Sequence, residues 1–221
     1  MKKFIKPVFF GLCFLIFTIL TKTIDVQAAG AQNSLIGFAA LNTSIFNFLG
    51  TNNFCYKLTQ LFGILAILVA AIFAVTGLVQ LIKRKSLFKV DSDLLMLGGV
   101  YILLIVVYVL FEKLAVNYRP VVLDEGLEPS YPSTHTMLIL TILGTSIRIL
   151  VNYIKNPKLL FTTRLGFLLI MALTVICRLL SGVHWFTDII GGVLISLFFI
   201  TLYESLTSSS ITVSKENQNE N

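Results

Sequence analysis

The sequence contains few charged residues: 13% of its 221 residues are Asp, Glu, Lys or Arg, whereas 56% are hydrophobic. This composition excludes an ordinary water-soluble domain, in which about a quarter of the residues are charged. Three cysteines, an odd number, do not form a disulfide framework. No basic cluster is interleaved with aromatic residues, so the net charge of +6 does not indicate nucleic-acid binding. Histidine occurs only twice, which makes its positions informative.

In place of charged residues, the sequence contains long apolar runs. A helix needs about 20 mainly apolar residues to cross a lipid bilayer. Six runs have roughly this length: 4–21, 58–82, 94–112, 136–154, 163–181 and 185–204. They are uniformly apolar rather than alternating, which predicts helices and not a barrel. We therefore predict an all-α, polytopic membrane protein with six transmembrane helices, in which residues 1–204 form a single domain and residues 205–221 a disordered cytoplasmic tail.

The N-terminal region allows two interpretations. The basic MKKFIK, an apolar stretch and then VQAAG are compatible with a signal peptide cleaved near Ala28. The apolar stretch is long for a signal peptide, so we favour an uncleaved span. Residues 30–55 are too short and too polar to cross the membrane, and we expect an amphipathic helix or loop on the outer surface that carries no chemistry.

Basic residues predict the orientation of the spans. Cytoplasmic connections carry an excess of Lys and Arg, and 12 of the 17 basic residues lie in segments that one orientation puts on the same side. These are Lys2, Lys3, Lys6, Lys83, Arg84, Lys85, Lys89, Arg148, Lys155, Lys158, Arg164 and Lys215. Two other segments, 113–135 and the join near 178–188, then face outward, and we expect a bacterial plasma membrane protein.

Both histidines lie in these outward segments. His135 ends the stretch YPSTH, and His184 stands in CRLLSGVHWFTDIIGG. Asp188 follows His184 by four residues, so on a helix the two side chains share a face and the carboxylate can orient the imidazole. An imidazole oriented in this way is a good nucleophile or general base.

Two of the five outward basic residues lie in the same segments. Arg119 and Arg178 carry guanidinium groups, which match phosphate oxygens in both geometry and charge. The hydroxyls of Ser133 and Thr134 and the start of the sixth span add anion-binding groups. Ionisable groups at the membrane are costly and are functional by default, so we expect an anion-binding site.

These motifs resemble those of the type 2 phosphatidic acid phosphatase (PAP2) superfamily of membrane lipid phosphatases. That family has Lys, six residues, Arg-Pro; then Pro-Ser-Gly-His; then Ser-Arg, five residues, His, three residues, Asp. Here the first motif ends in Arg119-Pro120, the second reads PSTH at 132–135, and the third is Cys177-Arg178, five residues, His184, three residues, Asp188. The resemblance extends over the whole chain in helix count and motif order, and it implies a PAP2-type helical bundle.

The resemblance implies hydrolysis of a lipid phosphate or diphosphate at the outer face of the membrane, without a metal or other cofactor. His184 would take the phosphoryl group as a phosphohistidine, and Asp188 would hold His184. His135 would protonate the leaving oxygen and then activate water. Arg119, Arg178 and Ser133, with Thr134 and Lys113, would bind the phosphoryl oxygens. The implied substrates are undecaprenyl diphosphate, phosphatidylglycerol phosphate and phosphatidic acid, among which the sequence does not choose.

The sequence departs from the family pattern at three positions. Glu112 stands where the family has lysine, and Lys113 is its neighbour, turned by about 100° on a helix but with a long side chain that can still reach a phosphate. Thr134 replaces the family glycine, and Cys177 replaces serine.

Three alternatives compete with this interpretation. A metal hydrolase with His135, His184 and Asp188 as ligands has a suitable ligand set, but the two nearby arginines would repel a cation. A serine protease around Ser133 lacks the glycines of a nucleophile elbow. The third alternative is a weakened relative that binds a phosphorylated lipid or a partner protein without turnover, and that tolerates Glu112 and Thr134.

Overall fold

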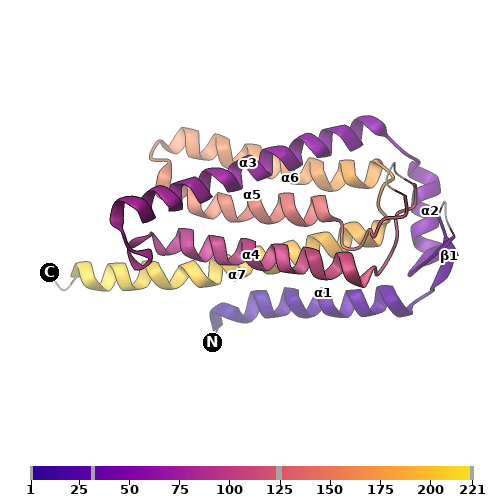
Figure 1. Ribbon diagram of the computed structural model, residues 1–221, viewed down its shortest axis with the longest axis horizontal. Helices are drawn as coiled ribbons and strands as arrows, with labels where there is room; N and C mark the ends of the chain where they lie inside the picture. Colours follow the sequence, from indigo (N-terminus) through magenta and orange to yellow (C-terminus); the bar gives the residue numbers. More distant parts are fainter. Residues whose placement is uncertain (1, 31–32, 123–125, 220–221) are drawn as a thin grey trace.

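Long helices that run back and forth along one axis make up most of the chain (Figure 1). The computed structural model describes residues 2–30, 33–122 and 126–219, with side chains described as far as residue 207. The helices are α1 (Ile5–Thr23), α2 (Ala39–Leu49), α3 (Asn53–Arg84), α4 (Ser92–Leu114), α5 (Thr134–Tyr153), α6 (Pro157–Leu180) and α7 (Phe186–Asn219). Strands β1 (Gln27–Ala29) and β2 (Ser34–Ile36) form an antiparallel hairpin between α1 and α2.

Six of these helices are long and apolar enough to cross a membrane, which confirms the predicted six-span, all-α organisation. The short α2 is the exception, in agreement with a segment outside the bilayer. Helix α7 continues to Asn219, past residue 204 where we expected a disordered tail to begin, and its membrane-length part is Phe186–Thr207.

Capping residues explain why two helices begin earlier than the apolar runs predict. The side chain of Asn52 accepts a hydrogen bond from the backbone N–H of Cys55, so α3 starts at residue 53 rather than 58. Asn156 caps α6 in the same way, and Pro157 fits the first helical turn because it has no N–H to satisfy there. These caps add a first turn to each helix, which hydropathy alone does not detect.

Helix α5 lies at the centre of the bundle, between α3 and α6 on one side and α7 on the other. Half of its residues are buried, namely Thr136, Met137, Ile139, Leu140, Thr141, Ile142, Leu143, Thr145, Ser146 and Ile149. Helices α1, α3 and α6 instead expose many of their large apolar side chains, as lipid-facing helices do. The bundle is therefore organised around α5 and α7, which also carry the two predicted histidine motifs.

The two ends of the bundle differ in chemistry. The connections 85–91 and 154–156 lie at one end with the C-terminus, and most of the predicted cytoplasmic basic residues are at this end. The opposite end carries α2, the hairpin, the connection 115–133 and the turn 181–185 (Figure 1). Every residue of the three family-like motifs lies toward this second end.

Two glycines of α7 allow the chain before α5 to approach closely. A β-carbon on Gly191 would lie 2.6 Å from the ring of Tyr131, and one on Gly192 would lie 3.1 Å from the carbonyl oxygen of Ser133. Tyr131 is buried and its ring packs against Phe14 and Phe111, so it has little room to move. Glycine at these positions is what lets the Pro-Ser-Thr-His segment rest directly on α7.

We predict that Gly191→Ala destabilises the protein, because the added methyl group overpacks the Tyr131 ring at a cost of about 1–3 kcal/mol. The matched control is Gly99→Ala in α4, where a β-carbon meets no atom within 4 Å and alanine improves helix propensity. Thermal unfolding in detergent should show a lower Tm for Gly191→Ala and an equal or higher Tm for Gly99→Ala. An unchanged Tm for Gly191→Ala would contradict the close packing.

Candidate active site

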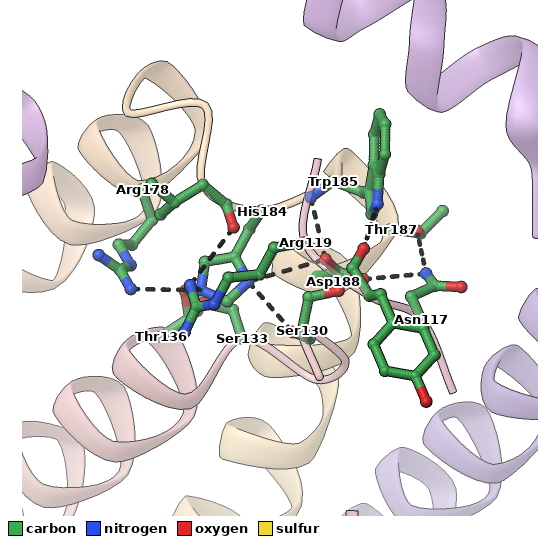
Figure 2. Close-up of polar contacts among 12 residues, drawn as sticks. Asn117, Arg119, Ser130, Ser133, Thr136, Arg178, His184, Trp185, Thr187 and Asp188 are labelled. Atoms are coloured by element: carbon green, nitrogen blue, oxygen red, sulfur yellow. Dashed lines mark hydrogen bonds and ion pairs between the residues drawn. The ribbon is translucent and has the colours of Figure 1, made fainter. Parts of the chain in front are cut away.

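Two stretches that are distant in sequence, 119–135 and 178–188, meet at the end of the bundle opposite the C-terminus (Figure 2). The connection 115–133 supplies Arg119, the first turn of α5 supplies His135, the last turn of α6 supplies Arg178, and the turn 181–185 supplies His184. The first turn of α7 adds Asp188. The structure thus brings together both histidines, both arginines and the carboxylate that the sequence singled out.

His184 is buried and lies between the two guanidinium groups (Figure 2). Its Nε2 is 3.2 Å from Nη2 of Arg178 and 3.4 Å from Nη1 of Arg119. Guanidinium nitrogens only donate hydrogen bonds, so Nε2 is the acceptor and the ring proton is on Nδ1. Nδ1 donates to the backbone carbonyl of Ser130 at 3.1 Å. The lone pair of Nε2 therefore points to the place where the two cations meet.

The electrostatic surroundings keep His184 neutral. Burial, followed by the positive charges of Arg178 and Arg119, holds the pKa of His184 well below the usual value for histidine. A neutral imidazole whose Nε2 carries no proton is the nucleophilic form of this side chain.

Asp188 lies behind His184 rather than in direct contact with it. We expected its carboxylate to orient the imidazole, but Oδ2 is 3.7 Å from Nδ1 and the Ser130 carbonyl is the nearer acceptor. The carboxylate instead accepts hydrogen bonds from the backbone N–H of Trp185 at 2.9 Å and from Nδ2 of Asn117 at 3.0 Å. It thereby fixes the turn that carries His184 and adds a negative charge close to Nδ1.

His135 shares one nitrogen of Arg178 with His184. Nη2 of Arg178 is 3.0 Å from Nδ1 of His135 and also donates toward Nε2 of His184. The other ring nitrogen of His135, Nε2, is 2.5 Å from Oε1 of Gln60 in α3. One guanidinium group thus holds the two imidazoles at a fixed separation.

Arg178 is the most deeply buried cation of the site, with 1% of its surface exposed. Nη1 donates to the hydroxyl of Thr59 at 3.1 Å, and the ring of Tyr56 lies under the guanidinium group at 5.7 Å. Within the part of the chain that the structure describes, no carboxylate pairs with Arg178, and its Nε–H has no hydrogen-bond partner. A buried cation with an unused donor and no counter-ion is suited to binding an anion.

Arg119 is held differently, by a carboxylate. Its Nε forms an ion pair with Glu128 at 2.7 Å, and its backbone N–H donates to the carbonyl of Glu128 at 3.1 Å. This pairing leaves Nη1 directed toward the Val183 carbonyl and His184, both at 3.4 Å. Glu128 therefore aims the guanidinium group at the imidazole, a role that sequence analysis did not find.

Ser133 and Thr134 occupy different environments. Ser133 is fully buried; its N–H donates to the backbone carbonyl of Asp188 at 2.9 Å, and its hydroxyl accepts a hydrogen bond from Thr136 at 3.0 Å. Thr134 is half-buried and lines, with His135, a lateral groove of about 170 Å³ between α3 and α5. Ser133 thus joins α5 to α7, whereas Thr134 faces the side of the bundle.

Lys113 is not among the residues that meet at the site. It lies on the exposed side of the last turn of α4, as Glu112 does, whereas their neighbour Phe111 is buried. Among the described residues, Lys113 has no hydrogen bond or ion pair. The position of the family lysine therefore contributes no cation to the cluster around His184.

Sequence analysis also missed a buried polar network behind the site. Asn117 donates to Asp188 and to the hydroxyl of Thr187, and Asn42 of α2 both donates to that hydroxyl, at 2.9 Å, and accepts from the Thr187 N–H, at 3.1 Å. The only signal in the sequence was the polar character of Asn117, two residues before Arg119. The outer segment that we expected to carry no chemistry therefore supports the start of α7.

The metal-hydrolase alternative requires three ligands around one point. Across the described ranges, no group of three His, Cys, Asp or Glu side chains is arranged to hold a metal ion. Nε2 of His184 also faces two guanidinium groups, which oppose a bound cation.

Two comparisons with known proteins found a match. A model of the PAP2 superfamily matches residues 94–210. A solved structure, described as a transmembrane PAP2 type phosphatidylglycerolphosphate phosphatase from Bacillus subtilis, superimposes with a TM-score of 0.62. The two chains are 21% identical, and the match covers 92% of this chain and 96% of the other. The search of curated proteins found no match.

We predict that Asn117→Ala lowers both the stability of the protein and the activity of this site, because the buried Asp188 carboxylate loses its side-chain donor. The expected loss of stability is about 1–3 kcal/mol, the usual cost of leaving a buried polar group without its partner. Asn152→Ala is the matched control, since Asn152 also donates to a carboxylate, that of Asp93, at 2.7 Å, but is exposed to solvent. Equal Tm values for the two variants would contradict a special role of the buried network.

Proposed function

This chain belongs to the PAP2 superfamily and is a membrane phosphatase at the level of that family; from this premise we propose that it hydrolyses a lipid phosphate or diphosphate through a phosphohistidine on His184, without a metal ion. The observation that carries the proposal is Arg178, a buried guanidinium group with no carboxylate partner among the described residues that contacts both imidazoles. A phosphoryl group is the anion that fits between two guanidinium groups and a nucleophilic nitrogen.

In the first step, Nε2 of His184 attacks the phosphorus atom and the bond to the leaving oxygen breaks. Arg178 and Arg119, which face Nε2 in the free protein, turn their N–H groups to the phosphoryl oxygens and stabilise the negative charge of the transition state. His135 gives a proton to the leaving oxygen, so that the lipid leaves as an alcohol or a monophosphate.

In the second step, water attacks the phosphohistidine. His135, now neutral, accepts a proton from the water as the new P–O bond forms and the P–N bond breaks. Inorganic phosphate leaves, and His184 returns to the neutral state that its surroundings favour. The Ser130 carbonyl and the Asp188 carboxylate stabilise the proton that Nδ1 carries throughout the cycle.

The distribution of charge supports an active site at the outer face. Most basic residues lie at the opposite end of the bundle, and basic segments remain in the cytoplasm. The outer end lies at head-group level, where a lipid phosphate is presented to a protein. The lateral groove beside His135 has apolar walls formed by Ile64, Ile67 and Leu138, which suits the hydrocarbon chain of such a lipid. Undecaprenyl diphosphate, phosphatidylglycerol phosphate and phosphatidic acid are the substrates that we propose to test.

A second candidate function is lipid phosphate binding without turnover. The observation that favours it is the exposed position of Lys113, which leaves the site with two cations from arginine and none from lysine. The two functions share the pocket and differ only in whether phosphate is released.

The decisive experiment is phosphate release by the purified protein in detergent with EDTA present. We expect inorganic phosphate from at least one of the three lipid substrates, because the proposed chemistry needs no cation. Binding of all three lipids without release would favour the second candidate. Activity that EDTA abolishes and zinc restores would overturn the metal-independent mechanism.

We predict that His184→Ala abolishes turnover, by roughly 10³-fold or more as expected for loss of a nucleophile, but still binds lipid phosphate through Arg119 and Arg178. The measurements are phosphate release and calorimetric binding of the same lipid. Lys158→Ala, at the opposite end of the bundle, is the control for purification and detergent effects. Residual activity close to that of the wild type would show that His184 is not the nucleophile.

A further inference from the structure

One face of α3 forms a wall of the active site. Tyr56, Thr59, Gln60 and Gly63 stand at positions i, i+3, i+4 and i+7, which share one face of a helix, and each of the four lies against Arg178 or His135. Gly63 gives His135 room, because a β-carbon there would lie 3.3 Å from Cδ2 of the imidazole. This helix lies outside residues 94–210, which the family model matches.

The hydrogen bonds of His135 leave only one arrangement of its proton. Arg178 has no acceptor, so Nδ1 of His135 must accept its hydrogen bond. A neutral imidazole then carries its proton on Nε2, which must donate, and Gln60 must present its amide oxygen rather than its NH₂ group. The two histidines consequently hold opposite tautomers: Nε2–H in His135 and Nδ1–H in His184.

We propose that Gln60 is a positioning residue that holds the Nε2–H of His135 throughout the reaction and thereby makes Nδ1 the nitrogen that exchanges the catalytic proton. This inference rests on the proposed function. Nδ1 faces Arg178 and the phosphate site, whereas Nε2 faces α3. The amide oxygen of Gln60 also stabilises the positive charge of the ring when both nitrogens are protonated, as a neutral acceptor does.

The proton balance of the reaction fits this assignment. When the lipid phosphate binds, Arg178 turns its N–H groups to the phosphoryl oxygens, and Nδ1 of His135 is free to take up a proton from solvent. His135 then enters the first step as an imidazolium. The Nδ1–H bond breaks, an O–H bond forms on the leaving group, and the neutral ring stays hydrogen-bonded to Gln60 through Nε2–H. In the second step, water loses a proton to Nδ1 as its oxygen binds phosphorus, and the imidazolium is restored. Gln60 accepts the same hydrogen bond in both states, so it does not need to move.

The pH at which the imidazolium form of His135 loses a proton and becomes neutral depends on every charge that faces the ring. These charges and titratable groups are Arg178 from α6, Arg119 from the connection 115–133 and His184 from the turn before α7. From α3, the contact with the ring is the uncharged Gln60. Replacing this amide therefore changes one neighbour and leaves the cations in place.

Two variants of Gln60 test the assignment through the pH dependence of kcat. Activity should fall as the pH rises and His135 loses the proton it must donate. Gln60→Glu places a carboxylate on Nε2–H and should move this alkaline limb to higher pH by about one pH unit, whereas Gln60→Leu removes the acceptor and should move it to lower pH by a similar amount. We expect kcat of Gln60→Leu to fall with little change in KM.

The matched control is Gln80→Leu, the same replacement on the same helix. The side chain of Gln80 bonds to Asp91 at the opposite end of the bundle, so this variant should leave the alkaline limb where it is. If the alkaline limb of the kcat profile lies at the same pH in Gln60→Glu and Gln60→Leu, or moves in the same direction in both, the positioning role is overturned. Gln60 would then be a packing residue.

A spectroscopic measurement separates this inference from the proposed reaction. Because the chain has two histidines, a sample with ¹⁵N-labelled histidine gives two imidazole spin systems, which the His184→Ala variant assigns. We expect the proton of the neutral ring on Nε2 in His135 and on Nδ1 in His184. A proton on Nδ1 of His135 would overturn the assignment whether or not the protein is active. The expected tautomers in a protein that releases no phosphate would support the hydrogen bond and overturn the reaction.

Discussion

The arrangement of this site depends on the fact that a guanidinium group can donate hydrogen bonds but cannot accept them. Nη2 of Arg178 lies within reach of both imidazoles, so the nitrogen that each ring turns toward it must be an acceptor. The proton of each ring is then forced to the far side, where it needs an acceptor of its own. The fold supplies the Ser130 carbonyl for one ring and the Gln60 amide for the other. Burial makes these contacts obligatory, because an unsatisfied polar group inside the protein is costly.

The sequence predicted the groups that carry charge but not the groups that hold them. Six apolar runs and two histidine motifs were sufficient for the six-span fold and for the residues that meet around Arg178. Local hydrogen bonds of Asn52 and Asn156 moved the helix starts, which hydropathy does not measure. Gln60 was not found because its contact with His135 joins residues 75 positions apart, and such pairings follow from packing rather than from spacing. A backbone carbonyl such as that of Ser130 carries no signature in the sequence at all.

The hairpin and α2, which are too short to cross a membrane, support the site. Asn42 of α2 holds Thr187, and Trp185 packs against Ile36 and Ala39 while its Nε1 donates to the Tyr118 carbonyl. These contacts fix the turn that carries His184 from the side opposite to the arginines. Rigid support of this kind keeps reacting groups aligned without spending binding energy on their ordering. A hairpin and a helix too short to cross a membrane can thus support the active site of a membrane protein.

Helix α1 packs against α7, which the ribosome synthesises much later. The hydroxyl of Ser205 bonds to the backbone of Lys3 across 202 positions, and Thr18 of α1 bonds to Tyr131 beside the site. Chains are made from the N-terminus, so α1 must wait for its partner until α7 leaves the ribosome. The turn with His184 and the helix with Asp188 are also made after the other residues of the site. A nascent chain therefore carries the two arginines without His184 between them, and His184 joins them only when the bundle closes.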